Sequence, residues 1–375
     1  MKILFITNNY LKGSTGAIYA SKAFINSFAA VSENITVLYP IKHGYEPTDI
    51  DQKVRLIPID DKRSKFRKGI DLLLGKMHRY NYDICKYFNN QIYDMVVFDS
   101  SIASFHLIKK ARAAGLKCIC IHHNYQIEFV KDDTPWYLLP LMLFWTYFSE
   151  RDAVRNSYLN LTLTQTDAES LRKHYDKNGK FEVLGVCDFL HKEYIAEPDG
   201  DKVALNFVIT GQLASIQTEN SLIPWLEFYF PILKEMYPDA SLVVAGRSPS
   251  NKLINKCKEL GVTIIPSPES MKPIMNNGNY YICPTSLGSG LKLRNMDGLR
   301  AGMQILTHEK SARGYEEMVN AGVMYVYSDI ESFKQQLSAM VQSTKSKQDV
   351  LVAYKSYFSL NSGITRLKSI LQNLK

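Results

Sequence analysis

A glycine-rich stretch from Pro284 to Gly302 holds the residues with the clearest potential for chemistry. It follows a short apolar run, typical of a buried parallel strand, and leads into apolar residues at helical spacing. Gly288 and Gly290 permit backbone conformations in which successive N–H groups turn towards one ligand. Lys292 and Arg294 place two cations on the expected first turn, where they oppose the helix dipole unless an anion joins them.

These features predict a binding site for a di-anionic phosphate. The alternative is an ordinary strand-to-helix turn, because a single G-x-G is weak evidence for phosphate binding when it is taken alone. The elements around the loop must decide between the two interpretations.

A second polar cluster follows the apolar run 117–121. His123 and Asn124 stand at the carboxyl end of an expected strand, where open α/β sheets bind their ligands. A histidine in such a position can act on a hydroxyl or a phosphate group, although a structural histidine is the alternative.

The order of elements indicates an α/β fold. Residues 2–7 read as a strand, and a loop containing Gly13 and Gly16 separates it from a helix over 17–30 and a strand over 35–39. This order opens a doubly wound parallel sheet. The glycines lack the G-x-G-x-x-G spacing and no acidic residue closes the second strand, which disfavours a nicotinamide-dependent dehydrogenase.

A polar, turn-rich segment at 197–202 reads as a linker, and the strand–helix pattern restarts after it. With 375 residues the chain is long enough for two domains. We expect a first domain over 1–198 and a second over 199–349, with a helix at about 350–375 that packs back on the first. Two such sheets imply a cleft that binds ligands.

Composition narrows the range of partners. The chain has 45 basic and 37 acidic residues and a net charge of +8, spread along its length, with no nucleic-acid-binding motif. This charge suits an anionic ligand or a membrane surface better than nucleic acid. The six cysteines have no metal-binding spacing, and the apolar run at 1–7 is too short for a signal peptide. We therefore expect a cytoplasmic protein without a metal or another cofactor.

Two segments raise the question of contact with the inner face of a membrane. Residues 62–79 combine seven Lys or Arg with one Asp and several apolar residues, and residues 136–148 are strongly apolar and aromatic. The first could lie on anionic lipid, but a helix with its apolar side on the core is slightly favoured. The second is too short to span a bilayer, so a buried helix or a membrane-touching surface are the alternatives.

Several stretches of the second half together resemble a known family. They are Phe207–Gly211, Leu242–Gly246, Gly288–Gly302 and Thr307–Gly314. They resemble the C-terminal half of retaining GT-B glycosyltransferases of the family 4 type, in the subgroup with a G-S-G-x-K-x-K-x-x-E-A-like motif. The first half is similar more loosely, through its glycine loop, His123-Asn124 and a Thr-x-Thr-x-x-Asp junction at Thr164–Asp167.

The resemblance implies two Rossmann-like domains that face each other across a cleft. It implies a nucleotide-sugar donor on the second domain, a glycan or lipid-linked acceptor on the first, and sugar transfer with retention and without a metal. The catalytic residues implied are Lys292, Arg294 and His123, and the acceptor-binding residues are His123 and Asn124. The donor-binding residues implied are Gly13, Gly16, Gly211, Arg247, Gly288, Ser289, Gly290, Leu291, Lys292, Arg294 and Asp297.

The sequence departs from the family pattern at positions that contact the donor. Asp297 stands in place of a ribose-binding glutamate, Ser289 in place of a sugar-binding glutamate, and Gln212 and Gln217 in place of an Arg and a Lys on the diphosphate. The expected activity is glycosyl transfer in bacterial cell-surface polysaccharide biosynthesis. The alternatives are a non-catalytic subunit that binds nucleotide sugar and a nucleotide-sugar epimerase on the same fold.

Overall fold

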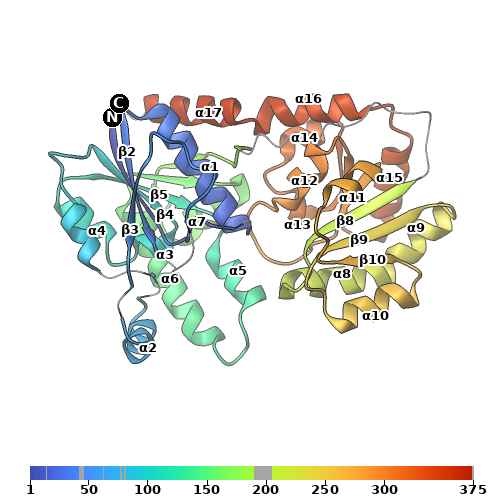
Figure 1. The fold of residues 1–375 in the computed structure, drawn as a ribbon, viewed down its shortest axis with the longest axis horizontal. Helices are drawn as coiled ribbons and strands as arrows, with labels where there is room; N and C mark the ends of the chain where they lie inside the picture. Colours follow the sequence, from blue (N-terminus) through green and yellow to red (C-terminus); the bar gives the residue numbers. More distant parts are fainter. Residues whose placement is uncertain are drawn as a thin grey trace. The chain divides into compact units, whose positions relative to one another are not determined.

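The computed structural model describes residues 1–13, 15–41, 46–61, 63–76, 78–79, 82–189 and 205–373. The chain forms two compact units (Figure 1). Unit 1 consists of Met1–Leu190 with Phe358–Lys375, and unit 2 consists of His191–Tyr357. The expected domain boundary between positions 198 and 199 lies outside the described residues.

Unit 1 contains a seven-stranded sheet with the order β3-β2-β1-β4-β5-β6-β7, and every pairing in it is parallel. This order arises when the chain winds outwards from β1 in one direction and then, through β4, in the other. The strands are β1 (Lys2–Thr7), β2 (Asn34–Pro40), β3 (Arg55–Ile59), β4 (Met95–Asp99), β5 (Lys117–His122), β6 (Leu159–Thr162) and β7 (Phe181–Val183).

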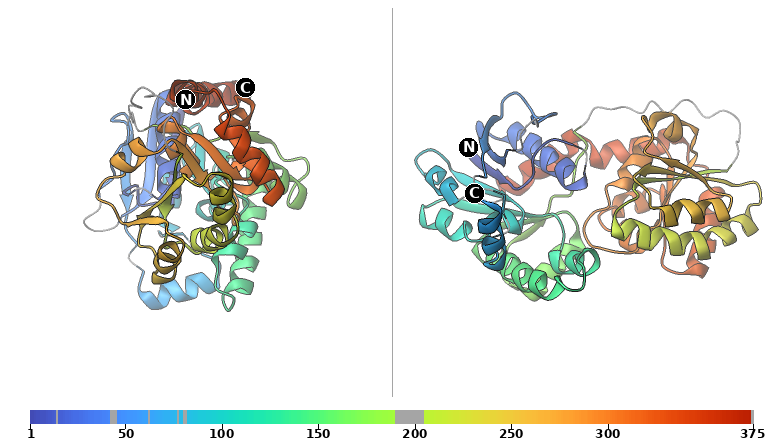
Figure 2. Two further views of the ribbon diagram at one scale, coloured as in Figure 1. Left: turned by 90° about the vertical axis from the view of Figure 1, so that its right-hand side faces the viewer. Right: turned by 60° about the horizontal axis from the view of Figure 1, so that its bottom comes forward.

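Helices cover both faces of this sheet (Figure 2). The helices of unit 1 are α1 (Gly16–Val31), α2 (Lys65–Leu73), α3 (Ser101–Ser104), α4 (Ile108–Ala113), α5 (Gln126–Asp133), α6 (Leu139–Asn156), α7 (Gln165–His174) and α17 (Leu360–Gln372), with a short 3₁₀ segment at Tyr82–Tyr87. No helix among the described residues has the length and apolar character needed to cross a bilayer.

Unit 2 repeats the plan with a six-stranded parallel sheet in the order β10-β9-β8-β11-β12-β13. Its strands are β8 (Asn206–Gln212), β9 (Ser241–Arg247), β10 (Thr263–Pro266), β11 (Tyr280–Cys283), β12 (Gln304–His308) and β13 (Met324–Tyr327). Its helices are α8 (Ile216–Phe228), α9 (Phe230–Met236), α10 (Asn251–Glu259), α11 (Lys272–Asn277), α12 (Arg294–Arg300), α13 (Glu309–Ala312), α14 (Glu316–Asn320), α15 (Ile330–Val341) and α16 (Lys347–Phe358).

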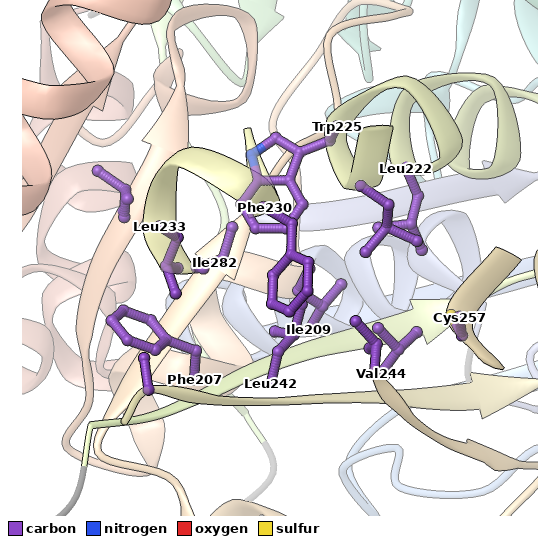
Figure 3. Packing of buried hydrophobic residues seen from close by; sticks show 14 of the residues in the cluster. Phe207, Ile209, Leu222, Trp225, Phe230, Leu233, Leu242, Val244, Cys257 and Ile282 are labelled. Carbon is purple, nitrogen blue, oxygen red and sulfur yellow. The ribbon is translucent and has the colours of Figure 1, made fainter. Parts of the chain in front are cut away.

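The core of unit 2 explains why this sequence adopts the fold. Alternate residues of β8, Phe207 and Ile209, point to one face of the sheet, as the two-residue period of a strand requires. Leu222 and Trp225 recur at helical spacing on α8 and face them (Figure 3). Burying these side chains stabilises the unit by about 1.5–3 kcal/mol each. The predicted pair of doubly wound parallel sheets is confirmed.

The last two helices belong to different units. Helix α17 packs on α1 of unit 1, whereas α16 groups with unit 2. Gly363 of α17 lies so close to Cys187 that an added Cβ would come within 2.5 Å of its Cβ. Within the expected terminal segment 350–375, it is therefore the part from Leu360 onwards that packs back on unit 1.

Helix α7 is capped by Thr164, whose hydroxyl accepts the N–H of Asp167. One local expectation is wrong. Helix α2 does not place its apolar side on the core. Phe66 is 80% exposed and Leu73 is 63% exposed.

Candidate functional site

The loop between β11 and α12 follows the expected strand–loop–helix order. Gly288 and Gly290 both have φ of +74°, in the left-handed region that favours glycine. A Cβ on Gly288 would lie 2.5 Å from Oε1 of Gln217, on α8. The glycine is therefore required both by its backbone conformation and by the close approach of a second element.

Arg294 is the first residue of α12 and reaches across to the start of α8. Its Nη2 donates a hydrogen bond to Oγ1 of Thr218 at 2.9 Å. The guanidinium lies against Gly211, which has φ of +146°, and a Cβ there would be 3.1 Å from Cζ of Arg294. The three elements β8, α8 and α12 thus hold this cation in one place.

Two donor groups in this cluster have no hydrogen-bond partner among the described residues. Nη1 of Arg294 and Nε2 of Gln217 are both buried and unpaired. Buried donors are almost always satisfied in folded proteins, and an unsatisfied one costs about 1–3 kcal/mol. A cation and an amide that leave such groups open beside two glycines in the left-handed region form a cradle suited to an anion.

Lys292, the second expected cation, stabilises its own loop. Its Nζ donates to the carbonyl of Ser289 at 3.1 Å, and its carbonyl accepts the hydroxyl of Tyr315 at 2.9 Å. Tyr315 is fully buried, and burial raises its pKa well above its usual value, so its hydroxyl keeps the proton that it donates. Helix α12 begins two residues after Lys292, which places this lysine in the turn that precedes the helix.

The remaining donor-binding candidates of unit 2 take up varied positions. Asp297 lies in the first turn of α12 and its Oδ1 accepts from Nη1 of Arg300 at 3.3 Å. Ser289 and Leu291 are buried in the loop, and Arg247 is exposed at the end of β9, where it pairs in register with Gln212 of β8. The structure therefore brings Gly211, Gly288 and Arg294 together most directly.

A network of buried polar groups marks the carboxyl ends of the strands in unit 1. Asp99, at the end of β4, is fully buried. Its Oδ2 accepts the hydroxyls of Thr7 at 2.6 Å and Ser21 at 2.5 Å, and its Oδ1 lies 2.6 Å from Nε2 of His123. Burial opposes ionisation of Asp99, but the charge and hydrogen bond of His123 and the two hydroxyl bonds together lower its pKa.

This network fixes the orientation of the His123 ring. Because the ionised carboxylate of Asp99 can only accept, Nε2 of His123 must carry a proton, and Nδ1 is the acceptor in the neutral ring. The ring of His123 also packs edge-to-face with the ring of Phe24, with 5.7 Å between the ring centroids and an interplanar angle of 89°. His123 can therefore present Nδ1 in a defined direction, as an acceptor when the ring is neutral and as a donor when it is charged.

The two neighbours of His123 differ in their contacts. Burial lowers the pKa of His122 to about 4, and its Nε2 lies 2.9 Å from Oδ1 of Asn160. Oδ1 of Asn124 is buried without a hydrogen-bond partner among the described residues. The expected acceptor-binding residues, His123 and Asn124, follow directly after β5.

Two buried acidic side chains bind the start of α5. The backbone N–H of Tyr125 donates to Asp167 and that of Gln126 donates to Glu150, at 2.9 and 2.7 Å. Burial raises the pKa of Glu150 to about 8, and the hydroxyl of Tyr175 donates to it at 2.9 Å. This arrangement fixes the start of α5, the helix that begins two residues after Asn124.

The glycines expected near the donor in unit 1 lie between β1 and α1. Gly13 has φ of +106°, and Gly16 is the first residue of α1. Both are exposed.

Sequence reasoning missed the residues that orient the candidates. Asp99, Thr7 and Ser21 were not expected to act with His123, and Thr218 was not expected to bind Arg294. A signal existed for Asp99, because parallel strands end at one edge and β4 is the neighbour of both β1 and β5. No group of three or more His, Cys, Asp or Glu suited to a metal ion lies in the part of the chain that the structure describes.

No family model matches the sequence, and no curated protein matches it. Solved structures do match over almost the whole chain. A sucrose-phosphate synthase from Thermosynechococcus elongatus has a TM-score of 0.72 at 10% identity, covering 100% of this chain and 98% of its own. HepE from Anabaena, solved with UDP, has a TM-score of 0.67 at 10% identity and full coverage of both chains.

WaaG, a glycosyltransferase involved in lipopolysaccharide biosynthesis, has a TM-score of 0.63 at 14% identity, covering 98% of this chain and 99% of its own. At these identities the likeness shows the fold alone. That fold is the GT-B fold, with two α/β units built on parallel sheets, as the sequence predicted.

Proposed function

We propose that this protein is a glycosyltransferase that moves a sugar from a nucleotide-sugar donor to a glycan or lipid-linked acceptor. The observation that carries the proposal is the cluster in unit 2, where the guanidinium of Arg294 and the amide of Gln217 offer buried, unpaired donors. The proposal gains support from structural neighbours, since HepE has been solved in complex with UDP-glucose.

The cluster suits the charge that develops in this reaction. When the bond between sugar and phosphate breaks, negative charge grows on the departing nucleoside diphosphate. Donors that are already fixed in place stabilise such charge without having to reorganise at the moment of reaction. We propose that Arg294 and Gln217 bind the diphosphate, with the backbone of Gly288–Lys292 beside it.

We propose that unit 1 binds the acceptor. His123 offers Nδ1 as a hydrogen-bond acceptor for a sugar hydroxyl, and Asp99 holds it in that orientation. Retention at the anomeric carbon is part of the proposal, with the leaving phosphate taking the proton of the acceptor hydroxyl on the same face. Independence from metals is proposed as well, together with a place at the cytoplasmic side of the membrane in surface-polysaccharide assembly.

The test is a panel of nucleotide sugars, with binding measured by calorimetry and turnover by release of nucleoside diphosphate with candidate acceptors. Arg294→Met should weaken donor binding by about 10- to 100-fold, since hydrogen bonds to charged groups contribute about 1.5–3 kcal/mol. Lys258→Met, an exposed cation on α10 of the same unit, is the matched control and should leave binding unchanged. Equal donor affinities for Arg294→Met and the wild type would remove the site assignment.

Metal independence needs its own measurement. Turnover should persist after treatment with a chelator and should not rise when divalent cations are added. The anomeric configuration of the product, read by NMR, decides between retention and inversion.

A second candidate is a subunit that binds nucleotide sugar without transferring it. The ion pair of Asp297 with Arg300 favours it, because this carboxylate is already engaged where a ribose contact was expected. Tight donor binding with no turnover against any acceptor would identify this function.

A further inference from the structure

Helix α2 exposes its apolar residues and buries its acid, which is the reverse of what a helix on a soluble core does. Phe66, Ile70 and Leu73 are spaced at i, i+4 and i+7 and so share one side of the helix. Phe66 is 80% exposed and Leu73 is 63% exposed. Asp71 is the buried residue of α2, with 3% exposure, and is held by ion pairs with Arg63 and Arg67.

The turn between α5 and α6 has the same character. Trp136 is 83% exposed and Tyr137 is 65% exposed, and Leu138 and Phe144 are exposed beside them. The fifteen residues from Thr134 to Phe148 include no charged side chain. Within this uncharged segment, the residues Trp136–Leu138, Phe144 and Tyr147 are exposed, whereas Thr146 is buried.

The two segments belong to one edge of unit 1. An added Cβ on Gly75, directly after α2, would come within 2.4 Å of the ring of Trp145 on α6. Figure 1 shows α2 and the turn between α5 and α6 at the lower edge of this unit, and the first view of Figure 2 keeps them at the same edge. We call these residues, Phe66, Ile70, Leu72–Leu74, Trp136–Leu138, Phe144 and Tyr147, the aromatic edge.

Positive charge accompanies the aromatic edge. Residues 62–79 hold seven Lys or Arg against one Asp. Lys65, Arg67 and Lys68 are exposed on α2 itself. Asp61 and Asp71 are each shared by more than one of these cations, which leaves a positive surplus.

We propose that the aromatic edge docks on an anionic lipid bilayer, with its apolar side chains inserted at the level of the headgroups. Trp and Tyr favour this interfacial region. An amphipathic helix with cations on its polar side binds anionic lipid both by burying its apolar side chains and by electrostatic attraction to the headgroups. The charge complementarity selects a bilayer over an apolar partner. The inference is independent of the proposed sugar transfer, because the surface does not include Arg294, Gln217, Asp99 or His123.

The first experiment is co-sedimentation of the full chain with vesicles of phosphatidylcholine, with or without phosphatidylglycerol. The wild type should bind only the anionic vesicles, and raising the salt concentration should weaken binding. Phe66→Ser with Leu73→Ser, and separately Trp136→Ser with Tyr137→Ser, should weaken binding by about tenfold or more. Lys65→Gln should weaken it by about fivefold.

The matched control is Phe228→Ser, which removes an exposed aromatic side chain of unit 2 and should leave vesicle binding unchanged. Circular dichroism melting curves check that each variant is folded. Absence of wild-type binding to anionic vesicles, or equal binding by the edge variants, would overturn the proposal. So would a dimer in gel filtration that the edge variants dissociate, because a second copy would then cover the edge.

Tryptophan fluorescence reports insertion directly. The chain has three tryptophans, and Trp225 is buried in the core of unit 2. Anionic vesicles should shift the emission to the blue and allow quenching by brominated lipid, and Trp136→Phe should abolish most of both effects. Unchanged quenching in Trp136→Phe would contradict insertion at this position.

Discussion

Gly288 is the residue at which two constraints can be separated by experiment. Gly288→Ala places a Cβ at φ of +74°, which costs about 1–2 kcal/mol, and drives it onto the Gln217 side chain. We expect a loss of about 2–4 kcal/mol of unfolding free energy and weaker donor binding, because Gln217 must move. Urea denaturation and calorimetry measure the two effects.

Gly261→Ala is the matched control for this substitution. Gly261 has φ of +69°, but an added Cβ there meets no atom within 4 Å. Gly261→Ala should lower the free energy of unfolding only by the cost of placing alanine at a positive φ, and it should leave donor binding unchanged. Equal effects of both substitutions would mean that the contact with Gln217 contributes nothing.

Asp99 links the stability of unit 1 to pH. Its pKa is lowered in the folded state, so its contribution to stability is present above the unfolded value of about 4 and is lost as pH falls through the folded value. Asp99→Asn should therefore cost about 1–3 kcal/mol at pH 7, and less as pH falls below about 4.

Urea denaturation at the two pH values tests the Asp99 prediction. The control is Asp94→Asn, at the other end of β4. The Asp94 carboxylate is exposed and accepts a hydrogen bond from the backbone N–H of Lys2, so this substitution should change the free energy of unfolding little at either pH. A cost for Asp99→Asn that does not depend on pH would show that Asp99 contributes by packing and neutral hydrogen bonds alone.

Arg294 and His123 show what the sequence could predict at the scale of single residues. Residue type and position at a strand end were enough to select both. Their partners could not be selected with the same ease. Thr218 is 76 positions from Arg294 and Asp99 is 24 positions from His123, and the tertiary fold alone brings each pair together. The roles of the candidates remain predictions.

At the scale of elements, the buried acid that binds the start of α5 makes the stability of unit 1 depend on pH. Burial raises the pKa of Glu150 to about 8, so the stability linked to it is complete below about pH 4.5 and is lost as pH rises through about 8. Glu150→Gln keeps an acceptor for the N–H of Gln126 and removes this dependence. It should exceed the wild type by about 1–3 kcal/mol at pH 9 and match it at pH 5.

Chemical denaturation at both pH values measures this difference, and Glu169→Gln on the exposed face of α7 provides the control. If the wild type were as stable at pH 9 as Glu150→Gln, ionisation of Glu150 would not affect the free energy of unfolding. We expect ionisation to lower it because the carboxyl group is enclosed by α5, α6 and Tyr175.

Elements differed in how far the sequence predicted them. The expected strands over 2–7, 35–39 and 117–121 match β1, β2 and β5 almost to their ends, because continuous apolar runs are typical of buried parallel strands. The orientation of α2 was not predicted: its buried residue is Asp71, which forms ion pairs with Arg63 and Arg67, while Phe66 and Leu73 are exposed. Amphipathic spacing shows that a helix has two sides, and it does not show which side meets the core.

At the scale of the whole molecule, each unit has its own core and should respond separately to a cavity. Leu367→Ala in α17 should destabilise unit 1 by about 2–5 kcal/mol, because Leu367 is fully buried. Hydrogen exchange should then rise in β1 and β2 and stay unchanged in β8 and β9. Leu337→Ala in α15 should give the opposite pattern.

A rise in exchange that spreads equally over both sheets in either variant would contradict this division. The sequence predicted two α/β halves from the restart of the strand–helix pattern. It could not divide the terminal helices between them, since α16 and α17 are both amphipathic and only contacts such as that of Gly363 with Cys187 distinguish them.

The return of the chain to unit 1 has a consequence for biosynthesis. Unit 2 is an insertion between the first 190 residues and α17, so the ribosome makes all of it before α17. Domains generally fold as units during synthesis. The nascent unit 1 therefore lacks one of its helices after all of its strands have been made, and the side of α1 that packs on α17 stays uncovered until α17 itself has been made.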